Sequence, residues 1–330
     1  MQSLALTDYQ LLTGALEFYS ACQSAGIRPI LGLEIVVKPP DEILRDASGI
    51  LVLLATNLAG WSNLCQLSSL LSDGSPEVTF EQIAHHSNHL ICLTGGLRSL
   101  LNHLLAVNQS RFATTWLARL QELFPERLYV EIQHHTNRDI NLWDEIFAIS
   151  RKLKLPCVAS HDVYYVRSDH ESLQRTLTAI RLIRPNNDLP ASEVAPPQAY
   201  FKTPTEMQVA FAQHPEALTV SQEIASRCQL ELPLGKPLFP QIPLPEGAQP
   251  MDILRQKAVH GALNLYGEIS AEIQARLNNE LAVIAQCGYA TLFLIMEEIL
   301  SFARERGIPF SSRGSAASSL VAHCLGITSP

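Results

Sequence analysis

Six short apolar runs, separated by helical patterns, constrain the fold of the first half of this chain most strongly. The runs occupy residues 4–7, 29–37, 50–55, 90–94, 128–132 and 156–160. Between them, apolar residues recur at the spacing of an amphipathic helix, as Leu12, Leu16 and Tyr19 do before a stop at Gly26. Strands that alternate with helices form βαβ units, so the pattern predicts an α/β domain with a mostly parallel sheet, open or closed into a barrel.

Polar residues stand within or directly after several of these runs. They are Asp8, Glu34, His134, His135, His161 and Asp162. In a parallel sheet the chemistry lies at the carboxyl ends of the strands, where carboxylates and imidazoles can hold a divalent metal ion that activates water. Each residue taken alone also fits a helix cap, a turn or a surface histidine. A metal-dependent phosphoesterase site at this edge is therefore one hypothesis among others.

Residues 166–250 are expected to connect the two parts of the chain and to serve as a packing scaffold, without catalytic residues. Leu173, Leu177 and Ile180 have helical spacing, and further helices are expected around 205–211 and 216–228. Residues 232–250 contain six prolines. This composition predicts an extended linker.

Three helices are expected from residue 251 onward. Ser270 is a candidate N-cap for the second helix, which ends before Gly288, and the third ends before Gly307. Residues 308–310 then predict a short strand, and the small residues from Ala316 predict a further helix.

The loop between that strand and helix has the residue types of a phosphate-binding loop. Arg313 supplies a permanent positive charge, Gly314 allows close approach of the backbone, and Ser315 adds a hydroxyl. A plain helix N-cap after a turn is the competing interpretation.

Composition narrows the class of protein. The 330 residues are 47% hydrophobic and 17% charged, as in an ordinary folded protein, and the net charge of −8 argues against a chain that grips nucleic acid by an overall basic surface. Seven scattered cysteines without a Cys-x-x-Cys pair predict reduced thiols and a cytoplasmic location. Without a positive leader or an apolar run of about 18 residues, neither export nor a membrane span is expected.

Five segments of the first part carry a family resemblance. Residues 5–8 (ALTD), 25–34 (AGIRPILGLE), 51–55 (LVLLA), 93–96 (LTGG) and 159–165 (ASHDVYY) resemble the PHP domain (polymerase and histidinol phosphatase) that opens the family C DNA polymerases. The resemblance implies a PHP-type βα barrel-like domain over residues 1–235, lacking its first strand.

The same resemblance implies a degenerate metal site. Of the family's metal ligands only Asp8, Glu34 and Asp162 match, while Tyr9 and Tyr164 stand where the family has histidines, and the first His-x-His pair would precede residue 1. A tyrosine must lose a proton with a pKa of about 10 before it can bind a metal easily. We therefore expect no zinc or manganese at this site, only vestigial ligands on a structural platform. A remodelled metal site that uses His134, His135 or His161 stays an alternative hypothesis.

The last part resembles the start of the family C palm. The matching segments include Glu280-Leu281, Gly288-Tyr289, residues 313–317 (RGSAA) and residues 325–328 (LGIT), and the spacing from Gly307 to Arg313 resembles the error-prone branch. The resemblance implies a proline-rich linker at 236–250 and a mainly helical N-terminal part of a nucleotidyltransferase palm at 251–330.

In this palm Arg313, Gly314 and Ser315 would bind the triphosphate, although Ser312 stands where the family prefers glycine. The family's catalytic aspartates would lie beyond Pro330. No catalytic residue is therefore expected in this chain.

The resemblance implies part of an error-prone DNA polymerase III alpha subunit, acting in replication or repair synthesis. Its implied partners are DNA, deoxynucleoside triphosphates, Mg²⁺ and other replication or repair subunits, and the chain alone is expected to be inactive. Two alternatives stay open: a freestanding PHP-type metal-dependent phosphoesterase or exonuclease, and a non-catalytic docking module of a polymerase complex.

Overall fold

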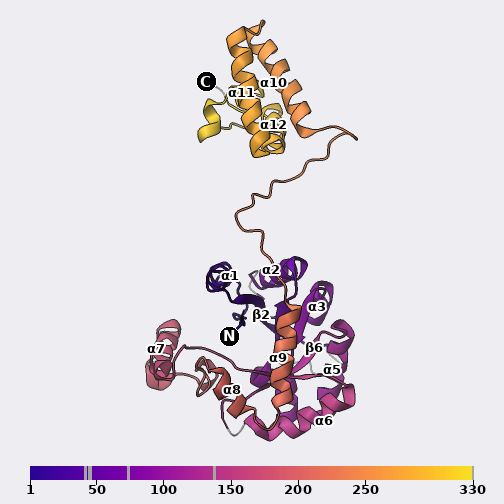
Figure 1. The fold of residues 1–330 in the computed structure, drawn as a ribbon, viewed down its shortest axis with the longest axis vertical. Coiled ribbons are helices and arrows are strands. Elements are labelled where there is room, and N and C mark those ends of the chain that lie inside the picture. The colour runs from indigo at the N-terminus through magenta and orange to yellow at the C-terminus, as the bar shows by residue number, and fades with distance from the viewer. Residues whose placement is uncertain (41–42, 44–46, 73–74, 137–138, 329–330) are drawn as a thin grey trace. The chain divides into compact units, whose positions relative to one another are not determined.

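The protein forms two compact units, residues Met1–Leu232 and Pro233–Pro330. A computed structural model describes residues 1–40, 43, 47–72, 75–136 and 139–328, without the side chains of Ser72, Ser192, Ser315 and Ala316. Figure 1 shows the first unit as helices around a curled sheet and the second as a group of helices. Residues 228–249 contain no helix or strand, and the division into domains at residues 235 and 250 stays a prediction.

One sheet organises the first unit. Its strands are β1 (Ser3–Leu6), β2 (Arg28–Lys38), β3 (Gly49–Ala55), β4 (Val78–Thr79), β5 (Leu90–Leu93), β6 (Leu128–Gln133) and β7 (Cys157–Ser160). The order is β1-β2-β3-β5-β6-β7, and β4 pairs with β2. All six predicted strands are confirmed, whereas the two-residue β4 was not predicted because it is too short to show a pattern.

The predicted parallel sheet is correct for most pairings but not for β3. β1–β2, β2–β4, β5–β6 and β6–β7 are parallel, while β3 runs antiparallel to both β2 and β5. Residues 39–48, which join β2 to β3, are too few for the crossover of a dozen or more residues that a parallel connection needs. β3 therefore turns back, and its amino end lies at the edge where the other strands end.

Helices follow the strands in the predicted alternation. They are α1 (Ala15–Ser24), α2 (Leu58–Ser72), α3 (Phe80–His86), α4 (Leu100–Ala106), α5 (Ser110–Leu123), α6 (Trp143–Leu153), α7 (Glu171–Leu182), α8 (Pro204–Ala210) and α9 (Pro215–Arg227). The expected helices near 205–211 and 216–228 are thus confirmed as α8 and α9. An α/β fold of PHP type is confirmed for the first unit.

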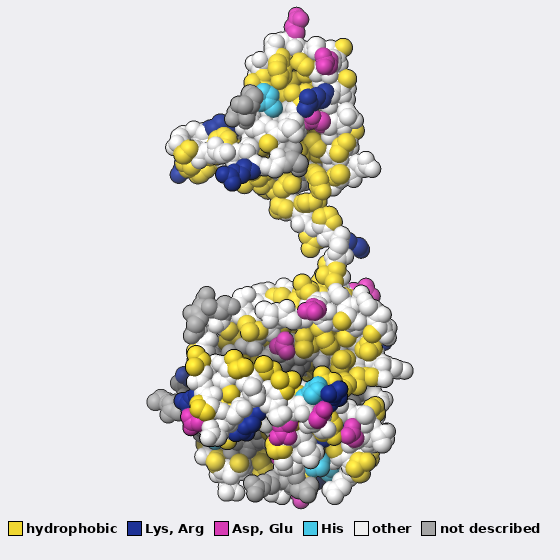
Figure 2. Space-filling view, turned by 90° about the vertical axis from the view of Figure 1, so that its left-hand side faces the viewer, with side chains coloured by type: hydrophobic (Ala, Val, Ile, Leu, Met, Phe, Trp, Pro, Cys, Tyr) yellow, Lys and Arg dark blue, Asp and Glu magenta, His cyan; other side chains and the backbone are white. Residues whose placement is uncertain are grey.

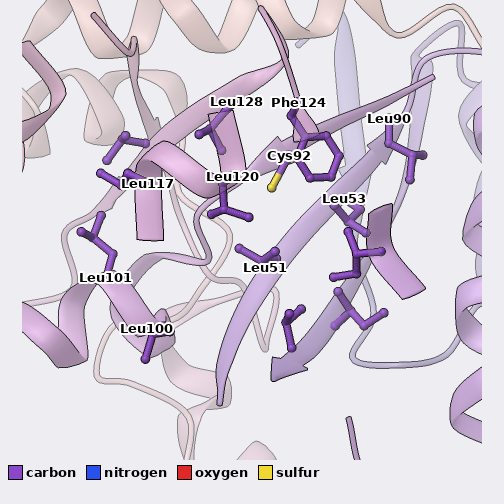
Figure 3. Packing of buried hydrophobic residues seen from close by; sticks show 14 of the residues in the cluster. Leu51, Leu53, Leu90, Cys92, Leu100, Leu101, Leu117, Leu120, Phe124 and Leu128 are labelled. Atoms are coloured by element: carbon purple, nitrogen blue, oxygen red, sulfur yellow. The ribbon is translucent and has the colours of Figure 1, made fainter. Parts of the chain in front are cut away.

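The sheet is buried on both faces. On one face Leu51, Leu53 and Cys92 pack against Leu120 and Phe124 at the end of α5 (Figure 3). The other face carries a second cluster, in which strand residues from Ile30 to Val158 contact Ile224 of α9. Strands covered on both sides read as continuous apolar runs, which explains why they stood out in the sequence.

The second unit is helical. It contains α10 (Pro250–Tyr266), α11 (Ala271–Cys287), α12 (Ala290–Glu305) and the short α13 (Leu320–Cys324). The predicted caps are confirmed: the Ser270 hydroxyl accepts a hydrogen bond from the Ile273 amide at 3.3 Å, and Gly288 adopts a left-handed conformation with φ of +70°. Leu254, Leu277 and Leu281 are fully buried in its core.

Two local predictions for the second unit were wrong. Residues 308–310 form no strand, since no described residue of this unit forms a strand with which they could pair. The helix expected from Ala316 is a 3₁₀ turn, η6 (Ser315–Ser318), followed by α13.

The apolar stripe of α12 is partly exposed in this unit. Leu292, Met296, Ile299 and Phe302 are between 36% and 53% exposed. Figure 2 shows hydrophobic side chains over much of the visible face of the second unit.

No single helix in the described ranges is long and apolar enough to cross a membrane. Taken together, α11 and α12 would be long and apolar enough, but the two helices are bent by 110° relative to each other.

Candidate functional site

Polar side chains collect on one face of the first sheet, at the edge where its parallel strands end. Side chains alternate along a strand, so Glu34 of β2 and Glu131 of β6 share the face that also packs on α9. Asp8, which follows β1, and Asp162, which follows β7, line a common pocket of about 460 Å³ with them. The structure therefore brings the three predicted residues Asp8, Glu34 and Asp162 to one site.

Arg98 pairs with two carboxylates of this pocket, and the sequence pattern did not single it out. Its Nη2 atom lies 2.7 Å from Oε1 and 2.6 Å from Oε2 of Glu34, and 3.7 Å from Oδ2 of Asp162. The guanidinium carbon lies 6.0 Å from the ring centre of Tyr9, within cation–π range. One guanidinium thus pairs with two of the three predicted metal ligands.

A glycine turn places Arg98 there. Gly95 and Gly96 have φ values of +90° and +55°, and they lead β5 into the 3₁₀ turn η1 (Gly96–Arg98). A Cβ atom on Gly95 would lie 2.0 Å from the carbonyl oxygen of Ile50. The Gly-Gly pair was visible in the sequence as a turn signal, but nothing local linked Arg98 to Glu34, 64 residues earlier.

Burial sets the protonation of this pocket. The Glu34 side chain is 13% exposed, and burial raises its pKa to about 7 even though the charge of Arg98 opposes the shift. Burial, with the charge of Asp162, raises the pKa of Tyr164 to about 12. Burial also raises the pKa of Tyr9. Both tyrosines therefore keep their protons at neutral pH.

Glu131 joins three strands instead of facing a ligand. It is 4% exposed and accepts hydrogen bonds from the Gly95 amide at 3.0 Å, from Gln133 Nε2 at 3.4 Å and from the Ser160 hydroxyl. Burial raises the pKa of Glu131. Its carboxyl group thus connects β6 and β7 with the turn after β5, so it acts as a structural anchor.

Of the predicted histidines, His161 lines this pocket, whereas His134 and His135 line another one. His135 and His161 stack with ring centres 4.4 Å apart, and His161 Nε2 lies 3.1 Å from the carbonyl oxygen of Gln198. Burial lowers the pKa of both rings, that of His161 to about 4. His134 Nδ1 lies 3.0 Å from the carbonyl oxygen of Ala210. The stacked pair is therefore uncharged at neutral pH.

The donor set of the 460 Å³ pocket does not fit a divalent metal ion. Among the described residues, no group of three or more His, Cys, Asp or Glu side chains is arranged to hold one. Glu34 and Asp162 face a guanidinium, and Tyr9 and Tyr164 are poor ligands while protonated. We therefore derive no hydrolytic step at this site.

The second candidate site is the Arg313 loop, which we define as residues 311–319. Arg313 and Gly314 are exposed, and Gly314 has a φ of +94° with open space where a Cβ would stand. Arg313 lines a pocket of about 220 Å³ whose other walls include Leu292 and Met296 of α12. The side chain of Ser315 lies outside the described part of the structure.

At the N-terminus of α13, the helix after this loop, backbone amides already have hydrogen-bond partners within the protein. The Ser319 hydroxyl accepts a hydrogen bond from the Ala322 amide at 3.2 Å, and Glu280 Oε2 accepts one from the Val321 amide at 3.0 Å. The amides of Val321 and Ala322 are thus already bonded and do not face the loop. Arg313 and the backbone around Gly314 are therefore what the described structure offers to a phosphate.

Two known domain families match the sequence. The PHP domain matches residues 1–135, and the bacterial DNA polymerase III alpha NTPase domain matches residues 252–329.

Similar proteins align along almost the whole chain. DNA polymerase III subunit alpha of Bacillus subtilis is 33% identical over 99% of this chain, and its counterpart in Treponema pallidum is 31% identical over 99%. An error-prone DNA polymerase of Symbiobacterium thermophilum is 31% identical over 99%. The chain spans only 29% to 31% of the length of these relatives.

Proposed function

The chain combines a PHP domain with a domain of the bacterial DNA polymerase III alpha family, and from this premise we propose that it forms part of a DNA-directed DNA polymerase. Its substrates would be DNA and deoxynucleoside triphosphates. The spacing from Gly307 to Arg313 supports the error-prone branch. We further propose a cytoplasmic location, supported by seven cysteines that all carry free thiols, and partners among replication and repair subunits.

The single observation that carries this proposal is the exposed Arg313 beside Gly314. A guanidinium forms two-pronged hydrogen bonds with phosphate oxygens, and the glycine leaves room for a ligand next to the backbone. Arg313 lines a pocket together with residues of α12. This arrangement supports binding of the outer phosphates of an incoming nucleotide.

The second unit supports binding without catalysis. DNA polymerases generally use Mg²⁺ held by carboxylates, which neutralises charge during phosphoryl transfer. The described residues that line the pocket at Arg313 include no Asp or Glu. We therefore propose no catalytic step at this pocket and expect no primer extension by the chain alone.

The first unit would then be a support for the polymerase and not a phosphoesterase. The ion pairs of Arg98 with Glu34 and Asp162 favour this role, because these two carboxylates already face a positive charge.

Photocrosslinking tests the proposed function. A photoreactive deoxynucleoside triphosphate should label peptides within residues 308–328 of the full chain, and unlabelled dATP should compete while deoxyadenosine should not. Labelling that is spread over the surface, or that deoxyadenosine removes equally well, would contradict a triphosphate site at the Arg313 loop.

A further inference from the structure

Arg276 and Glu280 make side-chain contacts with the segment that follows Arg313. Both residues belong to α11, four positions apart, and so lie on one side of that helix. Arg276 Nη2 donates to the carbonyl oxygen of Ser318 at 3.0 Å. Glu280 Oε2 accepts from the Ser319 hydroxyl at 2.8 Å and from the Val321 amide at 3.0 Å.

The two side chains also hold each other. Arg276 Nε lies 3.1 Å from Glu280 Oε1, so each oxygen of the Glu280 carboxylate has its own donors. The Glu280 side chain is 21% exposed. Although burial opposes ionisation, hydrogen bonds from the amides of Val321 and Leu320, together with Ser319 and Arg276, lower the pKa of Glu280. The carboxylate is therefore charged at neutral pH.

The helix that carries this pair is a rigid support. Leu277, Leu281 and Ile284 anchor α11 in the core of the second unit, with exposures of 6% or less. Arg276 and Glu280 flank that buried stripe, so their side chains start from a fixed backbone. Precise sites depend on such support from regular elements.

Backbone hydrogen bonds involve two parts of the Arg313 loop. The Ala317 amide donates to the Gly314 carbonyl oxygen at 3.1 Å, and the Ser319 carbonyl oxygen accepts from the His323 amide at 3.0 Å. At its start, the Ser312 hydroxyl donates to the Ile327 carbonyl. At its end, Arg276 contacts Ser318 and Glu280 contacts Ser319.

We propose that Arg276 and Glu280 are positioning residues, which hold the end of the Arg313 loop so that Arg313 and Gly314 are preorganised for a triphosphate. The proposal rests on the proposed function of that loop. Neither residue touches the ligand in this scheme. Arg276 acts through the Ser318 carbonyl, and Glu280 acts through the Ser319 hydroxyl and the Val321 amide.

Two measurements on the full chain test the proposal together. The first is hydrogen exchange of amides 313–321, and the second is affinity for dATP, with inorganic tripolyphosphate as a probe without a base. Arg276→Met and Glu280→Gln should speed exchange in this segment about tenfold and weaken binding of both probes about five- to tenfold. Glu298→Gln, at an exposed position of α12, is the matched control and should change neither.

The outcomes separate this proposal from the proposed function. Wild-type exchange and wild-type affinity in both variants would overturn the positioning role. If the wild-type chain binds neither probe, the triphosphate role of the loop fails, and the positioning role for a triphosphate fails with it. In that case faster exchange in the two variants would show that Arg276 and Glu280 stabilise the segment without a role in triphosphate binding. Arg276→Lys, which keeps a donor for the Ser318 carbonyl, should exchange as slowly as wild type, and this separates loss of that contact from a general loss of helicity in Arg276→Met.

Discussion

Replacing Glu34 by glutamine should flatten the pH dependence of stability of the first unit. The pKa of Glu34 rises from an ordinary value of 4.5 to about 7 in the folded protein. The folded state therefore binds more protons than the unfolded state between these two values, so stability falls as pH rises through that window. Lowering the pH below 4.5 would restore the full contribution of the protonated carboxyl.

The magnitude follows from the shift. A shift of about 2.5 units corresponds to about 3.4 kcal/mol, because one unit is worth about 1.4 kcal/mol. Roughly 2 to 3 kcal/mol of this falls between pH 5 and pH 8. The free energy of unfolding of wild type relative to Glu34→Gln should decline by that amount across this range.

Urea unfolding with a chelator in every sample measures this difference. Trp61, Trp116 and Trp143, the three tryptophans of the chain, all belong to the first unit, so tryptophan fluorescence follows its unfolding alone. A difference between wild type and variant that stays constant within about 0.5 kcal/mol from pH 5 to pH 8 would show that Glu34 is not the buried, poorly solvated carboxyl described above.

Three further predictions concern stability. Arg98→Met should destabilise the first unit by about 1 to 3 kcal/mol, and more at pH 8 than at pH 6, because Arg98 lowers the pKa of Glu34; equal losses at both pH values would refute the pairing. In Gly261→Ala the new Cβ would lie 1.9 Å from the Cys324 carbonyl oxygen, so α10 and α13 must separate. Overpacking of this kind costs about 1 to 3 kcal/mol, against a gain of at most about 1 kcal/mol in helix propensity, and circular dichroism melting should show a net loss. Thr203→Ala removes a capping box at α8 and should cost about 1 kcal/mol in the fluorescence-detected transition; an unchanged midpoint would show that the cap contributes nothing.

Regular elements were the most predictable part of this protein. The six apolar runs became strands because burial on both faces makes their pattern continuous, and Ser270 and Gly288 marked the ends of α11 by local backbone chemistry. The strand predicted at residues 308–310 failed because a strand needs a partner, which no local pattern can supply.

The arrangement within the sites was less predictable. Asp8, Glu34 and Asp162 could be placed at one sheet edge, since parallel strands bring their ends together. The position of Arg98 could not be predicted, because its pairing with Glu34 depends on the placement of β2 and β5 on either side of β3. The hydrogen bond from the Val321 amide at the start of α13 to Glu280 was likewise not predictable, because it joins residues 41 positions apart in the chain.

The central claim is that the phosphate-binding chemistry of this chain lies at Arg313, and isothermal titration of the full chain with dATP and Mg²⁺ tests it most directly. Wild type should bind saturably, and Arg313→Ala should bind at least about tenfold more weakly, since a charged hydrogen bond is worth about 1.5 to 3 kcal/mol. Arg255→Ala, an exposed arginine of α10, should bind as wild type does. Equal affinity in wild type and Arg313→Ala, or no binding by wild type, would contradict the account.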